Sequence, residues 1–289
     1  MAAAVHVGLS GWAYRGWRGT YYPRGLPQRL ELEHATARVG SIELNGTFYS
    51  LQRPSSYRSW ASRVPDGVLL PVKGPRLVTH MKRLRDVGPA MARFLSSGPL
   101  LLGDHLGPFL WQLPARTAFD REVLEPFLRG LPRTEGEAAR LARTADDLVR
   151  DRFDEAPWRR AGPGRADRPL RHALEVRHES FRDDGFADLC RELDVAVVVS
   201  DGAGRWPELD VVTSDHVYVR LHGSTELYAS GYSPEELDTW AARVRGWAAA
   251  PGVRLVTVHF DNDAKVHAPG DAEALSHRLG LEAGRGVLA

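Results

Sequence analysis

The sequence contains one cysteine and no long apolar run, and each shortage excludes a class of protein. Cys190 is the only cysteine among 289 residues, so no internal disulfide can form and a reducing compartment fits the chain. The chain has no apolar run of 18 residues, and its N-terminus lacks the pattern of a signal peptide. We therefore expect a cytoplasmic protein without a membrane partner.

Excess charge of one sign is also missing. The formal net charge is +1, which gives the whole molecule no strong bias toward nucleic acids or membranes. Lysine is scarce as well, with Lys73, Lys82 and Lys265 the only three, so arginine supplies most of the positive charge. Hydrophobic residues make up 43% of the chain, enough to bury a sizeable core.

Segments of strand character alternate with segments of helix character, and no hairpin signal lies between them. This pattern predicts a parallel sheet with helical crossovers. Eight such units indicate an α/β protein with a (β/α)8 TIM-barrel fold, built as a single domain over residues 1–289. A doubly wound open sheet is the alternative, but no glycine-rich dinucleotide fingerprint follows the first strand. The predicted strands are 5–9, 41–45, 68–73, 109–113, 172–177, 195–200, 216–221 and 254–260. A helix is expected over 82–95, although the Gly88–Pro89 pair would bend or restart it. Asp120, Ser233 and Asp271 are expected to open helices, Ser233 with a capping box.

A charged insert at about 133–170 interrupts this alternation. Residues 135–152 have helical character with many charges, and residues 161–169 are rich in glycine and proline, as in a mobile loop. The segment is interpreted first as a solvated helix and loop, and otherwise as a contact for the phosphate backbone of a nucleic acid.

Polar and aromatic residues recur where the predicted strands end. In a TIM barrel these carboxyl ends share one rim, and functional sites lie there. Pairs such as Glu43 with Lys73 can instead be satisfied ion pairs in the interior, but the whole set favours a ligand site. The residues expected to bind substrate are Trp12, Glu43, Asn45, Tyr49, Lys73, Gln112, Arg177, Arg220, Tyr228, Tyr232, Asn262 and Asp263.

The mixture of charges on this rim limits the chemistry. Lys73, Arg177 and Arg220 can hold an anion, most simply the phosphate of a small anionic substrate. A carboxylate beside arginine stays ionised, which suits a general base. The expected catalytic residues are Glu175 or Asp201 as base, His222 as acid and His178 as a further proton carrier.

A divalent metal is the alternative for the same rim. The imidazoles and carboxylates at neighbouring strand ends are of the type that binds divalent ions in barrel hydrolases. No His-Glu-x-x-His motif is present and cations compete for the rim, so no residue is assigned as a metal ligand. The residues considered were His178, Asp201, His222, His259 and Asp261.

Several motifs jointly resemble the YecE-like proteins, the DUF72 family. They include Ser-Gly-Trp-Ala-Tyr at 10–14, Glu-Leu-Asn-Gly-Thr-Phe-Tyr at 43–49, Glu-Val-Arg-His at 175–178 and Tyr-Val-Arg-Leu-His-Gly at 218–223. The resemblance runs in order along nearly the whole chain and implies a TIM barrel, with no settled activity. The family usually has Phe-Asn-Asn-Asp where this chain has Phe-Asp-Asn-Asp at 260–263.

Three functions remain open from the sequence. The first is a hydrolase of phosphoesters, including those of a nucleic acid. The second is a sugar-processing enzyme, which paired carboxylates and aromatic faces would suit. The third is a protein that binds a nucleic acid or small anion without catalysis, for which the arginine-rich residues 129–171 are the motivation.

Overall fold

The computed structural model describes residues 3–146, 149 and 165–282, and the fold is an alternation of parallel strands and helices. The strands are β1 (Ala4–Leu9), β2 (Ser41–Ile42), β3 (Leu70–Lys73), β4 (Leu106–Gln112), β5 (His172–Glu175), β6 (Ala196–Val197), β7 (Val199–Asp201), β8 (His216–Leu221) and β9 (Leu255–Phe260). The helices are α1 (Glu31–Thr36), α2 (Gly46–Tyr49), α3 (Pro54–Ala61), α4 (Gly88–Ser96), α5 (Arg121–Arg129), α6 (Glu135–Ala142), α8 (Asp184–Glu192), α9 (Pro234–Ala249) and α10 (His267–Leu279).

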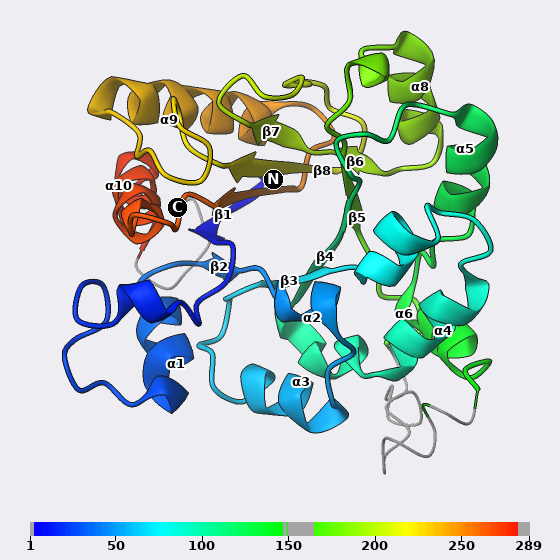
Figure 1. Cartoon of the computed structure of the whole chain (residues 1–289), viewed down its shortest axis with the longest axis horizontal. Helices are drawn as coiled ribbons and strands as arrows, with labels where there is room; N and C mark the ends of the chain where they lie inside the picture. Colours follow the sequence, from blue (N-terminus) through cyan, green and yellow to red (C-terminus); the bar gives the residue numbers. More distant parts are fainter. Residues whose placement is uncertain (1–2, 147–148, 150–164, 283–289) are drawn as a thin grey trace.

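All strand pairings within the two sheets are parallel, as the sequence predicted. One sheet has the order β2-β1-β9-β8-β7 and the other has the order β3-β4-β5-β6. Two isolated parallel bridges, Ser41 with Leu69 and Leu44 with Val72, join the neighbourhoods of β2 and β3. Only Val198 separates β6 from β7, and its amide donates to Leu174 of β5. The helices lie around the outside of the strands (Figure 1).

Side chains alternate between two environments along each strand, because successive residues of a strand point to opposite faces. Most buried residues form one large core, which includes Val5, Phe109 and Trp111. A second, small cluster comprises Leu110, Ala173, Ala196, Val198 and Tyr218, which lie on the opposite face of their strands. The polar site continues along this second face toward the carboxyl ends.

Local capping explains where several helices begin. The Asp120 carboxylate accepts from the Val123 amide at the start of α5, as expected. Ser233 and Glu236 form the expected capping box at the start of α9, followed by a proline in its first turn. The prediction that Asp271 opens the last helix is wrong, because α10 begins at His267. Asp271 instead accepts a hydrogen bond from Asn262 across 2.8 Å.

The segment after β3 also differs from its prediction. A helix was expected over 82–95, but only α4 (Gly88–Ser96) forms, restarting at the glycine–proline pair. The backbone φ angles of Arg83, Leu84 and Asp86 are 49°, 67° and 50°, which are incompatible with a right-handed helix. In the charged insert, α6 covers Glu135–Ala142, whereas residues 147–148, 150–152 and 161–164 of the predicted helix and loop lie outside the described residues.

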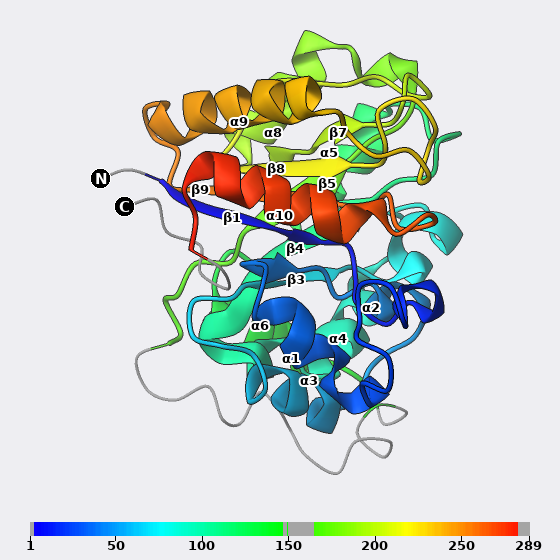
Figure 2. The ribbon, with the colours of Figure 1, turned by 90° about the vertical axis from the view of Figure 1, so that its left-hand side faces the viewer.

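Within the described residues, no helix is both long and apolar enough to cross a membrane. Figure 2 shows β1 running toward the side where α2 lies. The carboxyl ends of the parallel strands are gathered on this side.

Candidate functional site

Strand periodicity brings polar side chains to one place. Leu110, Ala173 and Tyr218 belong to the small inner cluster. Two residues further along the same strands, on the same face, lie Gln112, Glu175 and Arg220. Strand register then aligns these positions, since Gln112 pairs with Glu175 and Arg220 pairs with His259. The same face therefore carries an apolar layer and, above it, a charged layer.

Arg220 is at the centre of the charged layer, which we call the Arg220 cluster (Arg220, Glu43, Glu175 and Asp261). Its guanidinium donates twice to Glu43, with both distances 3.0 Å, and once to Glu175 across 2.7 Å. A further bond of 3.1 Å reaches Asp261. The arginine is 1% exposed, so three carboxylates take up its donors away from solvent.

Two hydroxyl groups complete the shell around the Glu43 carboxylate. Tyr218 donates to it across 2.7 Å, and Ser10 donates across 2.5 Å. Burial raises the pKa of Glu43, but the charges of Arg220 and His259 outweigh it and hold the pKa below the ordinary value. Glu43 is thus a buried, ionised anchor for the arginine.

The Glu175 carboxylate lies between two arginines, Arg177 and Arg220. Arg177 donates to it across 2.7 Å, and the same arginine donates to the Tyr228 hydroxyl across 3.1 Å. The guanidinium of Arg177 also lies over the Trp206 ring, 4.0 Å from its centre. Burial raises the pKa of Glu175, but Arg177 and Arg220 hold it well below its usual range. Such a carboxylate stays ionised and is a weak base.

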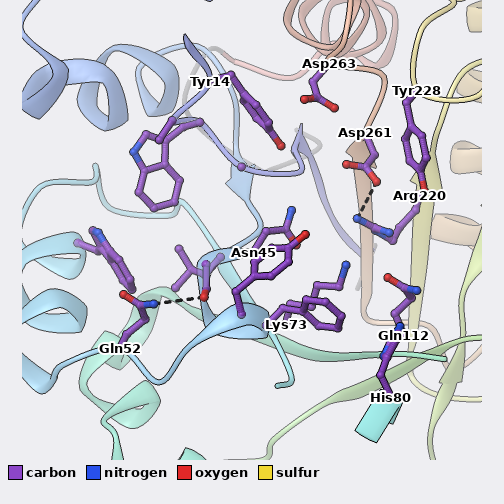
Figure 3. A pocket seen from close by; sticks show the side chains of 18 of the residues that line it. Tyr14, Asn45, Gln52, Lys73, His80, Gln112, Arg220, Tyr228, Asp261 and Asp263 are labelled. Carbon is purple, nitrogen blue, oxygen red and sulfur yellow. Dashed lines mark hydrogen bonds and ion pairs between the residues drawn. The ribbon is translucent and has the colours of Figure 1, made fainter. Parts of the chain in front are cut away.

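A cavity of about 700 Å³ opens beside this cluster, at the carboxyl ends of the strands. One part of its wall is aromatic, and Trp12 and Trp60 meet there edge to face with 5.8 Å between ring centres. The other part is polar, and Figure 3 shows Lys73, Gln112, Arg220, Tyr228 and Asp261 from the strand ends around it. The aromatic lining residues are Trp12, Tyr14, Phe48, Tyr49, Trp60 and Tyr228.

Lys73 differs from the two arginines in its surroundings. Among the described residues, no side chain or carbonyl oxygen forms a hydrogen bond or close ion pair with its ammonium group. The ammonium lies over the Phe48 ring, 4.8 Å from its centre. Burial, and then the charge of Arg220, lower the pKa of Lys73 to about 8, so it remains mainly cationic at neutral pH. A cation therefore lines the cavity with no described carboxylate at hydrogen-bond or ion-pair distance, although the more distant charges of Glu175, Asp261 and Glu43 partly offset its burial.

Two aspartates of the cavity wall have opposite pKa shifts. Burial raises the pKa of Asp261, but Arg220 and the hydrogen bond of His222 bring it down to about 2. Burial and the nearby charge of Asp261 raise the pKa of Asp263 to about 6. One carboxylate is thus permanently ionised, while the other can exchange a proton near neutral pH.

Several residues expected at the site do not line the cavity. His222 is fully buried, 2.9 Å from Asp261. Asp201 accepts a hydrogen bond of 2.9 Å from Tyr232. His178 caps a short helical turn by accepting from the Ser180 amide.

Another residue expected at the site, Asn262, holds a loop beside the cavity. Asn262 donates to the Ser230 carbonyl across 2.9 Å and so fastens the loop after β8. The expected residues that do line the cavity are Trp12, Asn45, Tyr49, Lys73, Gln112, Arg177, Arg220, Tyr228 and Asp263.

Other cavity residues were not assigned to the site from the sequence. Tyr14 and His80 follow β1 and β3, so their position after a strand was a usable signal. Gln52 and Trp60 come from the region of α3, and no strand-end pattern marks them. Burial lowers the pKa of His80, and nearby cations lower it further, with Lys73 having the largest effect among them.

The residues considered as metal ligands do not form one cluster, although His222 lies 2.9 Å from Asp261. His259 stacks on Tyr218 with 4.9 Å between ring centres, and burial lowers its pKa to about 4. In the part of the chain that the structure describes, no group of three or more histidine, cysteine, aspartate or glutamate side chains is placed to hold a metal ion.

Comparison with known families gives one match that spans almost the entire chain. Residues 6–287 match the family described as protein of unknown function DUF72. The chain belongs to the DUF72 family. This confirms the resemblance seen in the sequence motifs. No curated protein matches the chain.

Solved structures of DUF72 proteins share the fold. A DUF72 family protein from Thermotoga maritima is 24% identical, with a TM-score of 0.71, covering 96% of this chain and 99% of the other. A DUF72 family protein from Enterococcus faecalis is 17% identical, with a TM-score of 0.70 and 96% of each chain covered. At these identities the likeness concerns the α/β fold alone.

Proposed function

We propose that this DUF72 protein is an enzyme that acts on a phosphate-bearing substrate in the 700 Å³ cavity, and that its reaction is phosphoester hydrolysis. The observation that carries the proposal is Lys73. Its ammonium lines the cavity, has no carboxylate partner among the described residues and is mainly cationic at neutral pH. Burying a charge without a partner costs free energy, which an anionic ligand would offset.

The two arginines have a different role in this proposal. Arg220 donates to three carboxylates, and Arg177 donates to Glu175 and Tyr228. Their donors are largely taken up within the protein, so they shape the floor of the cavity. The phosphate would lie against Lys73, with the rest of the substrate along the aromatic wall of Trp12 and Trp60.

Asp263 is the proposed general base, in place of Glu175 or Asp201. Its pKa of about 6 matches base catalysis near neutral pH, and its carboxylate lines the cavity. Asp263 would take a proton from water as the water oxygen bonds to phosphorus. The bond from phosphorus to the leaving oxygen breaks, and that oxygen receives a proton from solvent.

Turnover of a phosphoester panel tests this assignment. The panel contains p-nitrophenyl phosphate, sugar phosphates, mononucleotides and oligonucleotides, each with and without Mn²⁺. We expect wild-type turnover and a loss of at least about 100-fold in kcat for Asp263→Asn. Asp238→Asn, an exposed aspartate paired with Arg278 across 2.6 Å, is the matched control. Equal rates for the two variants, or no wild-type turnover on any substrate, would overturn the proposal.

A sugar-processing enzyme is the second candidate. Asp261 and Asp263, with pKa values of about 2 and about 6, resemble the division between an ionised carboxylate and an acid in glycoside hydrolysis. Trp12 and Trp60 offer aromatic surface for a sugar ring. Release of sugar from aryl glycosides, without release of phosphate from the first panel, would select this function.

The fold supports a finer proposal as well. We propose that the two sheets form one eight-stranded TIM barrel, in which β6 and β7 act as a single strand and the bridges from Ser41 and Leu44 complete the ring. The ends of all strands would then belong to one rim of a single domain. An experimental structure with an open gap between β2 and β3 would contradict this arrangement.

A further inference from the structure

A second hollow lies next to the cavity on the same side of the molecule. Its volume is about 290 Å³, and it is formed by the loops that follow β3, β4 and β5. Three arginines line it, Arg83, Arg85 and Arg116, together with the carboxylate of Asp120 and the ring of Phe181. The hollow is therefore basic.

Two of these arginines have no partner among the residues that the structure describes. Arg85 lies 3.5 Å from Asp120 and forms a long ion pair. Among the described residues, the guanidinium groups of Arg83 and Arg116 form no hydrogen bond and no ion pair. Some surface arginines, such as Arg121 and Arg191, are paired with carboxylates at 2.9 Å and 2.6 Å, and others are not. What distinguishes Arg83 and Arg116 is that both line one hollow, where no described carboxylate lies within ion-pair distance of either guanidinium.

Arg116 connects the hollow to the main cavity. It lines the hollow, and its charge also acts on His80, which lines the cavity. The other cations that act on His80 are Lys73, Arg76 and Arg177. Lys73 of the cavity and Arg116 of the hollow therefore both lie close enough to His80 to lower its pKa.

The backbone of the hollow is held in a strained form. Arg83, Leu84 and Asp86 all have positive φ, a conformation that is unfavourable for residues with a side chain. Leu84 fixes the strained turn, because its side chain is buried and its amide donates to the Val78 carbonyl across 3.0 Å. This anchoring presents Arg83 at the hollow, and strain of this kind gathers at ligand sites.

Exposed hydrophobic side chains accompany the cations. Tyr49 is 72% exposed at the edge of the cavity, and Met81 is 64% exposed at the end of the helical turn Leu77–Met81. Phe48 and His80 meet edge to face with 5.0 Å between ring centres, which brings their neighbours Tyr49 and Met81 to the same part of the rim. The exposed ring at the edge of the cavity and the cations of the hollow offer stacking and charge, the two kinds of contact that bind single-stranded nucleic acid.

We infer that the hollow lined by Arg83 and Arg116 is a second phosphate site, and that the substrate is a single-stranded nucleic acid. The inference rests on the proposed function, in which one phosphate binds at Lys73. A neighbouring phosphate of the same strand would lie at Arg116 and Arg83, with a base stacked on Tyr49. Free phosphate or a mononucleotide would occupy the Lys73 site alone.

Fluorescence anisotropy with a labelled single-stranded oligothymidylate, measured at several salt concentrations, tests the second site. The variant is Arg83→Asn with Arg116→Gln, since asparagine tolerates positive φ. The control is Arg121→Gln with Arg191→Gln, which removes the same charge from arginines that have carboxylate partners. Binding of a labelled mononucleotide by both variants is measured in parallel.

The first variant should bind the oligonucleotide about 10-fold more weakly at 0.1 M salt, with a salt slope smaller by about 1.4. Its mononucleotide affinity, and both affinities of the control, should stay within about twofold of wild type. An unchanged salt slope in the variant, or wild-type oligonucleotide binding no tighter than mononucleotide binding, would overturn the second site. Oligonucleotide binding without any turnover would contradict the hydrolase proposal alone.

Discussion

Two groups of cations at the carboxyl ends of the strands differ in how their charge is balanced. In the Arg220 cluster, one arginine donates to Glu43, Glu175 and Asp261 in the interior. At the rim, Lys73 and Arg116 have no carboxylate partner among the described residues. The first arrangement is complete without a ligand, whereas the second leaves charge for a ligand to neutralise.

This difference distinguishes a cation that stabilises the fold from a cation that is available to bind a ligand. A buried arginine that already contacts three carboxylates holds strand ends together and fixes the floor of the cavity. A cation that faces a cavity without a partner is an electrostatic cost to the free protein. Substitution of Arg220 should therefore lower the stability of the fold. Substitution of Lys73 should instead weaken ligand binding.

The largest expected effect comes from Arg220→Met. The change leaves three carboxylates in the interior without their cation, which should lower the free energy of unfolding by about 3–5 kcal/mol. Urea denaturation followed by circular dichroism measures it. Adding Glu43→Gln to the Arg220→Met variant should recover part of the lost free energy of unfolding. If Arg220→Met alone is as stable as wild type, the role assigned to the cluster is contradicted.

An intermediate effect is expected from pH. Asp263, with a pKa of about 6, must lose its proton to act as base, so kcat/KM should fall as pH drops below 6. Lys73, with a pKa of about 8, must keep its proton to hold the anion, so kcat/KM should also fall as pH rises above 8. We expect a bell-shaped profile with about tenfold loss per pH unit on each side. Asp263→Asn should remove the acidic limb, and a flat profile between pH 5 and 9 would argue against both assignments.

The smallest expected effect belongs to paired arginines on the surface. Arg191 and Asp188 are 49% and 71% exposed and 2.6 Å apart, one turn of α8 from each other. Exposed pairs of this kind contribute little, so Arg191→Gln should change the free energy of unfolding by less than about 0.5 kcal/mol. The same denaturation assay measures this change. A loss of unfolding free energy close to that of Arg220→Met would contradict the distinction between buried and exposed paired arginines.

Much of the fold followed from local sequence patterns. Alternating strands gave the parallel sheets, and Asp120 and Ser233 marked helix starts through their capping side chains. The segment at Arg83 was missed because its left-handed backbone depends on the anchoring of Leu84, which periodicity does not report. Tertiary contacts decided that segment.

The site was only partly predictable for a similar reason. The strand-end pattern predicted that Arg220, Lys73 and Asp263 share a rim, and all three line one cavity. No sequence pattern distinguishes Arg220, which three carboxylates surround, from Lys73, which lines the cavity without a close carboxylate. Asp201 was expected as a base, but its bond to Tyr232, 31 positions further along the chain, depends on loop packing that no local pattern reports.

Calorimetric titration of inorganic phosphate and of a mononucleotide into Lys73→Met at pH 7 tests the central claim most directly. Lys265→Met, which removes an exposed lysine paired with Glu226 across 2.7 Å, is the matched control. Our account predicts at least about tenfold weaker binding for Lys73→Met, with thermal stability equal to or above wild type, and no change for Lys265→Met. Equal affinity in the two variants, or unfolding of Lys73→Met like that of Arg220→Met, would contradict it.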